Sequence, residues 1–180
     1  MKELRDRILK DVKVEMLDEF DKNFDRKAFF DQPWPKRKVS FGRGSLLAVT
    51  NRLRRSFRGR TGSDSIRFSS DAPYAGLHNA GGEIRVTPRM RAFFWAMYYK
   101  KSGQMALGKS GKASKSQRNV GLSTEAEFYK NMALTRAEKI VMPKRQIIGH
   151  HPKVAETVDR VAKRAIREYA EKTLLPILKK

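Results

Sequence analysis

Residues 103–110 match a nucleotide-binding pattern letter for letter. They read Gly-Gln-Met-Ala-Leu-Gly-Lys-Ser, which satisfies G-x-x-x-x-G-K-[ST]. In a P-loop the backbone amides cradle phosphates, the lysine reaches the β and γ phosphates, and the hydroxyl holds magnesium. That geometry needs a buried strand before the loop, for which Phe93–Tyr99 is a candidate, and a helix after it. Because Gly111–Ser116 is a poor helix start and no apolar run downstream ends in Asp, we interpret the segment as a basic loop.

Residues for other chemistry are few. The three histidines are His78, His150 and His151, and because the last two are adjacent, their side chains are expected to point apart rather than share a metal. The absence of cysteine excludes disulfides, thiol catalysis and Cys-type zinc sites. Gly42–Ser45 lacks the order of a nucleophile elbow. We therefore predict a protein that is not an enzyme and has no metal or cofactor.

Positive charge is concentrated in two blocks. The net charge is +21, and residues 32–63 and 84–124 each carry nine basic groups and no acidic group. A field concentrated in this way attracts polyanions. The blocks indicate loops or faces that lie near nucleic acid or an acidic neighbouring protein, or that only serve solubility.

The longest apolar run is Phe93–Tyr99. It is far shorter than the roughly 20 residues that span a bilayer, and the charged N-terminus does not look like a secretory signal. Basic residues flank the run, so membrane-surface binding and base stacking remain alternatives. We favour burial in the fold or at a subunit contact.

Helical spacing marks both ends of the chain. From Lys2 to about Phe29 apolar residues recur every four positions, which predicts a long amphipathic helix whose apolar face lines the core or binds a partner. Asp31–Pro35 stops it, since its two prolines lack backbone donors. Pro152 opens a last helix that ends near Pro176.

Short elements fill the middle, and residues 103–120 form a Gly/Ser/Lys-rich loop expected to be mobile until bound. The predicted elements are a helix at 45–57, strands at 56–60 and 66–69, a helix that Gly81 and Gly82 end, a strand at 83–87, helices at 89–101 and 124–139, and a strand at 139–142. The predicted fold is α+β, with a short antiparallel sheet packed by a long N-terminal and a C-terminal helix. We predict one domain, 1–180, in which 89–137 is an insertion containing a mobile basic loop, 102–122.

Three segments in order resemble the phage virion morphogenesis family, which includes the Mu-type G protein and related tail-completion, head–tail joining proteins. The first spans Leu47 to Phe57 and resembles the family's leucine-threonine-leucine-serine segment, with Asn51 in place of the family's usual glycine. The second, Tyr74–Gly82, resembles Tyr-Ala-x-x-His-x-x-Gly-Gly. The third, Val141–Gly149, resembles a Pro-x-Arg strand before the last helix. The residues that carry the resemblance are Leu47, Thr50, Leu53, Ser56, Tyr74, Ala75, His78, Gly81, Gly82, Pro143, Arg145 and Gly149.

The resemblance implies a structural virion protein of the phage neck or tail top, assembled in the bacterial host cytoplasm, without turnover chemistry. It implies a ring of copies, commonly six, between the head-side connector or adaptor proteins and the tail tube protein. Beside it, the residues suggest that Gly81 and Gly82 end a helix, that His78 hydrogen-bonds the adjoining loop, and that Pro143 and Arg145 suit an edge strand.

The basic blocks then acquire an expected role facing packaged DNA or an acidic neighbouring ring. A stand-alone nucleic-acid-binding protein remains the alternative, ahead of a P-loop protein. The candidate contacts are Arg52, Arg54, Arg55, Arg58, Arg60, Lys100, Lys101, Lys109, Lys112, Lys115 and Arg118.

Overall fold

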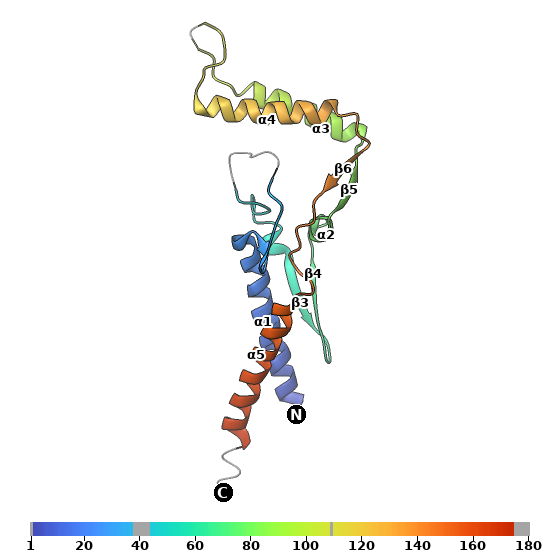
Figure 1. The fold of residues 1–180 in the computed structure, drawn as a ribbon, viewed down its shortest axis with the longest axis vertical. Helices are drawn as coiled ribbons and strands as arrows, with labels where there is room; N and C mark the ends of the chain where they lie inside the picture. Colours follow the sequence, from blue (N-terminus) through green and yellow to red (C-terminus); the bar gives the residue numbers. More distant parts are fainter. Residues whose placement is uncertain (1, 38–43, 109, 175–180) are drawn as a thin grey trace. The chain divides into compact units, whose positions relative to one another are not determined.

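The computed structural model describes residues 2–37, 44–108 and 110–174. Its helices and short antiparallel sheets confirm the predicted α+β class (Figure 1). Within the described residues the strands form separate two-stranded sheets instead of one sheet. The chain divides into two compact units. The first combines the chain up to Pro35, Leu46–Ala80 and the chain from Lys144, and the second combines Lys36–Ser45 with Gly81–Pro143.

The first unit is built on helix α1 (Lys2–Arg26), whose apolar stripe is buried as its four-residue spacing predicts. Charged residues occupy the remaining positions and form i, i+4 pairs such as Lys22 with Asp18, at 2.6 Å. The buried apolar residues of α1 are Val12, Met16, Phe20 and Phe24.

Helix α1 ends at Arg26, before the predicted end near Phe29. Lys27 has a φ of 54°, in the left-handed region that breaks a helix. The chain then enters strand β1 (Ala28–Phe29), which pairs with β2 (Gln32–Pro33). This turn directs the aromatic rings that follow α1 into the core under it.

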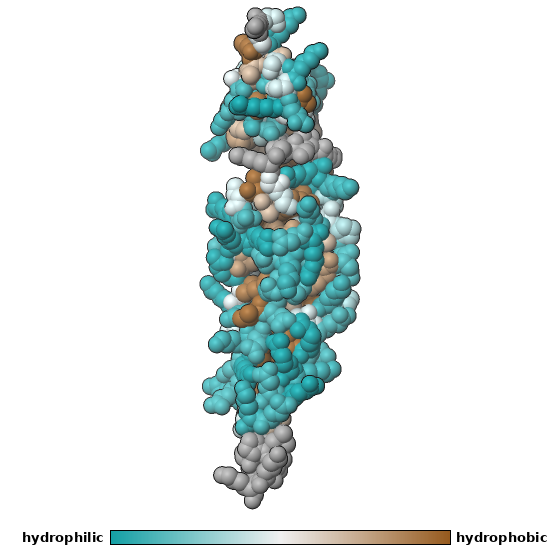
Figure 2. Space-filling model, turned by 90° about the vertical axis from the view of Figure 1, so that its left-hand side faces the viewer, coloured by the Kyte–Doolittle hydropathy of each residue, from teal (hydrophilic) through white to brown (hydrophobic). Residues whose placement is uncertain are grey.

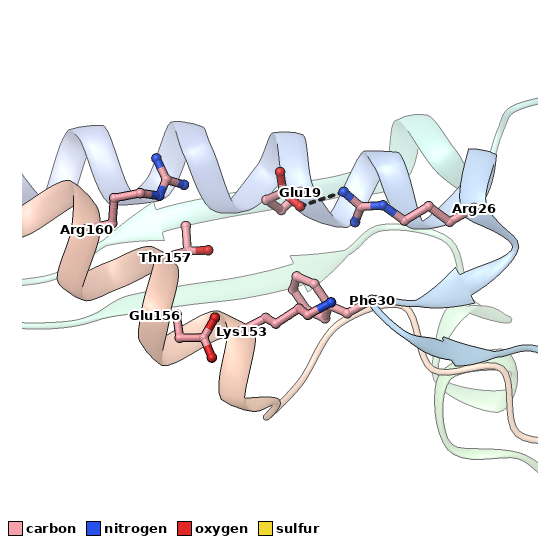
Figure 3. Close-up of a pocket in the computed structure, with 7 residues that line it drawn as sticks. All are labelled: Glu19, Arg26, Phe30, Lys153, Glu156, Thr157 and Arg160. Carbon is pink, nitrogen blue, oxygen red and sulfur yellow. Dashed lines mark hydrogen bonds and ion pairs between the residues drawn. The ribbon is translucent and has the colours of Figure 1, made fainter.

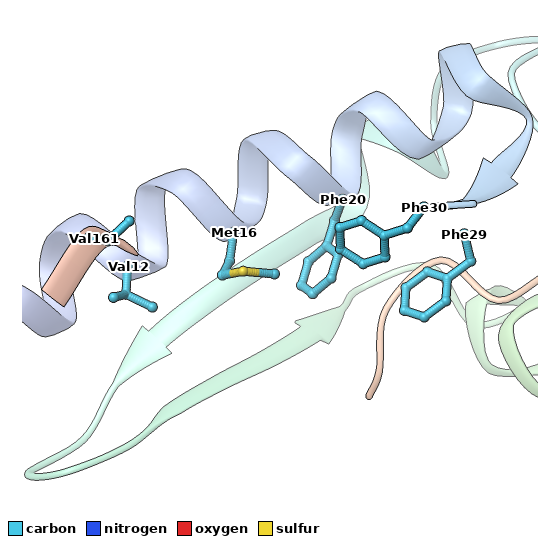
Figure 4. Close-up of a cluster of buried hydrophobic side chains, with 6 residues drawn as sticks. All are labelled: Val12, Met16, Phe20, Phe29, Phe30 and Val161. Carbon is cyan, nitrogen blue, oxygen red and sulfur yellow. The ribbon is translucent and has the colours of Figure 1, made fainter. Parts of the chain in front are cut away.

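A hydrophobic cluster joins α1 to the C-terminal helix α5 (Pro152–Tyr169), which runs beside it (Figure 1). Burial of an apolar side chain of this size contributes about 1.5–3 kcal/mol, so the cluster docks the two helices. Its buried members are Val12, Met16, Phe20, Phe29, Phe30 and Val161 (Figure 4). After α5 the chain continues in the π-helical turn η2 (Ala170–Leu174), and Pro176, where the helix was predicted to end, lies outside the described residues.

Strands β3 (Phe57–Thr61) and β4 (Ile66–Ser70) form the predicted antiparallel hairpin, closed by a bond from Gly62 N–H to the Ser65 carbonyl at 2.8 Å. Alternate side chains of the hairpin are half-buried and exposed. The half-buried side packs against α1, where the Phe68 ring meets Phe20 edge-on at 5.2 Å between centroids.

The helix predicted at 45–57 is wrong. Only a 3-10 turn, η1 (Arg54–Ser56), forms there. Leu47 and Asn51 have φ values of 62° and 56°, which interrupt a right-handed helix. Asn tolerates this conformation better than most residues with a Cβ atom, so Asn51 suits this position.

In the second unit, strand β5 (Gly82–Arg85) pairs with β6 (Lys139–Met142), and helix α3 (Pro88–Ser102) packs against helix α4 (Gln117–Leu134). These elements confirm the predicted strand at 139–142 and the helix at 89–101. Thr87 caps α3 by accepting from Met90 N–H at 3.2 Å.

Helix α4 begins at Gln117, not at Thr124, so it takes up the end of the segment predicted as a loop at 102–122. Ser116 is its N-cap and accepts from Asn119 N–H at 3.3 Å. The Asn119 side chain also donates to the carbonyls of Ala106 and Ser114, both at 2.8 Å. The two sides of the basic loop are therefore joined at the start of α4.

Candidate functional site

Helix α2 (Ala75–Ala80) brings together the second and first segments of the resemblance. One hydrophobic cluster in the first unit contains residues of both segments. Leu53 and Ala75 are buried members of it, and Leu47 and Tyr74 pack against it. The Ser56 hydroxyl donates to the Leu53 carbonyl at 2.6 Å and lies 2.5 Å from the Ser70 hydroxyl. The other members of the cluster are Phe24, Trp34, Ala72 and Ile147, with Leu46, Ala48, Phe57 and Ile148 packed on it. Thr50 is exposed.

The third segment is held against α2 by side chains and is not the edge strand that the sequence predicted, since β6 ends at Met142. The Asn79 side-chain oxygen accepts from Ile147 N–H at 2.7 Å and from Ile148 N–H at 3.0 Å. Arg145 N–H donates to the His78 carbonyl at 2.7 Å. The backbone groups of this segment are thus used by side chains and by α2 instead of a neighbouring strand.

Two further side chains, from outside the predicted site, complete this arrangement. The Asn23 amide of α1 donates to the Ile147 carbonyl at 3.1 Å and accepts from Phe30 N–H at 3.0 Å. Trp34 Nε1 donates to the Gln146 carbonyl at 2.7 Å. We name residues 74–80 and 145–149 with Asn23 and Trp34 the motif joint. In the sequence, Asn23 is only one polar residue beside the apolar stripe of α1, which does not indicate its partners.

The glycines of the motifs stand at positions that restrict side chains. Gly81 and Gly82 have φ values of 74° and 152° and end α2 as predicted. Gly149 has a φ of 143°, and a Cβ atom there would lie 2.5 Å from Gln146 Nε2. These residues shape the backbone of the chain around the motif joint, and none of them forms a catalytic group.

His78 packs edge-on against Tyr74, with 5.9 Å between ring centroids. Its buried Nδ1 has no hydrogen-bond partner among the described residues, so the predicted side-chain bond to the adjoining loop does not form at that atom. Burial, and then the positive charge of Arg145, lower the pKa of His78. Arg145 is itself buried and donates through Nε to the Pro35 carbonyl at 2.9 Å.

His151 has a structural role at the start of α5. Its Nδ1 accepts from Lys153 N–H at 3.2 Å, and its Nε2 lies 2.9 Å from Asp31 Oδ1. The ring stacks on Phe30 at 4.9 Å. In the part of the chain that the structure describes, no group of His, Asp and Glu side chains is placed to hold a metal ion.

The predicted basic contacts lie in both units. Arg54 is bound within the first unit, because its guanidinium donates to Asp21 and Asp25 at 2.5–2.8 Å. These hydrogen bonds raise the pKa of Arg54 further above its usual value. The exposed members are Arg52, Arg55, Arg58 and Arg60 in the first unit and Lys100, Lys112, Lys115 and Arg118 in the second, where Lys101 lies 2.5 Å from Glu125. Lys109 lies outside the described residues.

The segment with the P-loop pattern follows helix α3, whereas a P-loop follows a buried strand. Gly108 N–H donates to the Lys112 carbonyl at 2.7 Å, and Gly111 N–H donates to the Gly108 carbonyl at 3.0 Å. These amides close a turn of the loop instead of pointing into an anion site. The geometry of the described part of this loop therefore gives no support to nucleotide binding.

A groove of about 370 Å³ lies between α1 and α5 (Figure 3). Three cations line it, and each is paired with a carboxylate, so the groove offers little net charge to an anion. The pairs are Arg26–Glu19 at 2.9 Å, Lys153–Asp31 at 3.4 Å and Arg160–Glu15 at 2.7 Å. Neither catalytic geometry nor a cofactor cradle follows from this arrangement.

Helix α3 has no buried residue, and it carries two of the exposed aromatic side chains. Phe93 and Tyr99 are 56% and 65% exposed. The face of the molecule drawn in Figure 2 is mostly hydrophilic, with hydrophobic side chains in separate patches. The helices of the described chain include none with the length and apolar character needed to cross a bilayer.

Comparison with known proteins adds no relative to this picture. The chain matches no family model, no curated protein and no solved structure. The candidate functional features are therefore defined by their own geometry in each unit. The first unit has the hydrogen-bonded motif joint and the exposed arginines of the β3–β4 hairpin, and the second has the exposed Phe93 and Tyr99 of α3.

Proposed function

We propose that the chain is a structural protein of the phage neck or tail top, which completes the tail and joins it to the head connector. The observation that carries the proposal is the motif joint, in which segments far apart in sequence are tied together through Asn79, Arg145 and Asn23. The side chains of Asn79 and Asn23 bond backbone groups of the 145–149 segment and so fix the shape of the chain, as a structural role requires. The protein would act in the virion after assembly in the host cytoplasm.

Self-association into a ring, commonly a hexamer in the resembling family, is part of the proposal. Helix α3 carries apolar residues on all sides, and such helices are covered in the functional state. The exposed Phe93 and Tyr99 lie on it between basic ends and offer a contact to a neighbouring copy. Head-side connector or adaptor proteins and the tail tube protein would bind the two ends of the ring.

A stand-alone nucleic-acid-binding protein is the second candidate function. The exposed arginines of the β3–β4 hairpin favour it. It predicts that the isolated monomer binds DNA or RNA tightly and that this binding is sensitive to salt.

Electron microscopy of lysates from phage lacking this gene tests the first proposal. Filled heads and separate tails that never join, or tails with malformed upper ends, are expected, and the wild-type gene supplied in trans should restore joined particles. Intact, infectious particles in the absence of the gene would overturn the structural function and leave the second candidate.

A further inference from the structure

The β3–β4 hairpin has one face that faces away from the core. Half-buried and exposed residues alternate along the two strands, and the half-buried ones on the inner face include Phe57, Gly59, Ile66 and Phe68. A Cβ atom at Gly59 would lie 2.8 Å from Lys13 Cγ, which shows how closely α1 covers the inner face. We name the exposed set the outer hairpin face; it consists of Arg58, Arg60, Arg67 and Ser69.

The strand register places like charges directly opposite each other on this face. Arg60 pairs with Arg67, and Arg58 pairs with Ser69. Opposite residues on one face of a sheet have Cβ atoms about 4.5–5.5 Å apart, and a like-charge pair at that distance destabilises the sheet. The register therefore keeps two positively charged side chains on opposite positions of the face at a cost in stability, which a bound anion would offset.

Neighbouring carboxylates do not neutralise this pair. Asp64, near the hairpin turn, is 3.1 Å from Arg5, and Asp71 is 3.9 Å from Arg58. Across the described ranges, no carboxylate lies within 4.0 Å of the guanidinium nitrogens of Arg60 or Arg67. Arg60 and Arg67 thus present hydrogen-bond donors and positive charge to solvent.

The composition of the face distinguishes between two classes of partner. Protein–protein interfaces have an apolar or aromatic centre, and the outer hairpin face contains no apolar side chain. Protein–DNA interfaces are more polar and much more positive. The planar fork of arginine also matches the oxygens of a phosphate, and Ser69 adds a hydroxyl donor. These features favour nucleic-acid phosphates over an acidic protein.

We propose that the outer hairpin face binds the phosphodiester backbone of double-stranded DNA without reading its sequence. Arg60 and Arg67 each neutralise one phosphate. Arg58 lies two residues, or about 7 Å, along the strand, but it contributes less because it already donates to the Arg55 and Phe57 carbonyls and lies 3.9 Å from Asp71. Arg54 takes no part, because Asp21 and Asp25 hold it. Only the identification of this DNA as the packaged genome rests on the function proposed above.

The test is fluorescence anisotropy with the purified full-length protein and a labelled 30-base-pair duplex of mixed sequence, from 50 to 300 mM NaCl. The double variant Arg60→Gln with Arg67→Gln should lower the slope of log Kobs against log salt by about 1.8, or about 0.9 for each phosphate that the variant no longer neutralises. Arg136→Gln with Arg167→Gln removes the same charge from exposed positions elsewhere and should leave the slope unchanged.

Variants that preserve the positive charge distinguish a loss of DNA binding from a loss of folding. Arg60→Lys with Arg67→Lys should retain the salt slope, and the glutamine variant should melt no lower than wild type because the like-charge pair is gone. Equal salt slopes for the wild type and the glutamine variant would overturn the proposal. Failure of the wild type to bind the duplex at 50 mM NaCl, or binding of polyglutamate in its place, would also overturn it. Neither result would alter the phage-lysate test.

Discussion

Asn23 is the residue whose removal most directly tests the motif joint. The residue is 0% exposed and contacts two segments at once, through the Ile147 carbonyl and the Phe30 N–H. Asn23→Ala would leave both backbone groups without these partners. An unsatisfied buried group costs about 1–3 kcal/mol, so with two such groups the variant should lose about 2–6 kcal/mol of unfolding free energy. At about 3 °C for each kcal/mol in a chain of this length, that loss corresponds to a fall in Tm of about 6–18 °C.

Equilibrium denaturation in urea, followed by tryptophan fluorescence, measures this loss, because the buried Trp34 belongs to the motif joint and reports on its packing. Asn131→Ala is the matched control, since Asn131 is an exposed residue on α4, and its unfolding free energy should change by less than about 0.5 kcal/mol. Asn23→Asp should cost more than Asn23→Ala, because it buries a charge without restoring the donor. A loss below about 1 kcal/mol for Asn23→Ala would refute the role assigned to these hydrogen bonds.

Three further changes probe the charges and the exposed helix. Hydrogen bonds from Arg54 lower the pKa of Asp25, so this stabilisation is complete above the unfolded pKa of about 4 and is lost as pH falls through the lower folded pKa. Arg54→Gln should therefore flatten the acid limb of unfolding free energy against pH, and an unchanged limb would contradict the assignment. Burial and Arg145 lower the pKa of His78, so the folded state loses stability as pH falls below about 6.5; His78→Phe should reduce the drop in Tm between pH 7.5 and 5.5. Phe93→Ser with Tyr99→Ser should reduce self-association in sedimentation velocity, whereas an unchanged size distribution would exclude α3 as the contact.

Elements with strong periodicity were predictable from the sequence. The four-residue stripe predicted the helix α1, and the runs at 56–60 and 66–69 predicted two strands; these elements are found close to the predicted bounds. The boundaries were less accurate, because the left-handed residues Lys27 and Leu47 carry ordinary side chains and give no glycine signal. Ser116 was likewise missed as the cap of α4, since Thr124 and Glu127 offered a competing capping box inside the same helix.

The motif joint could be predicted only in part. The glycine pair and Tyr74 mark the end and the anchor of α2 from local rules. The bonds from Asn79 and Asn23 to the 145–149 segment join residues more than 60 positions apart. No periodic pattern encodes such pairs, because an asparagine looks the same whether its amide meets solvent or a distant backbone group. The same limit explains why an edge strand was expected where side chains satisfy the backbone instead.

The acid-free block at 32–63 shows why a run of positive charge does not by itself define a binding surface. Arg54 and Arg60 are six residues apart and equally basic in the sequence, but Arg54 lies on a 3-10 turn facing the carboxylates of α1 and serves the fold. Arg60 lies on the outward side of a strand, where the register sets it opposite Arg67, a residue outside the acid-free block. The outer hairpin face is therefore defined by strand alternation and pairing. If the DNA measurement followed total charge instead of this register, the Arg136→Gln and Arg167→Gln control would weaken binding as much as the hairpin variant does.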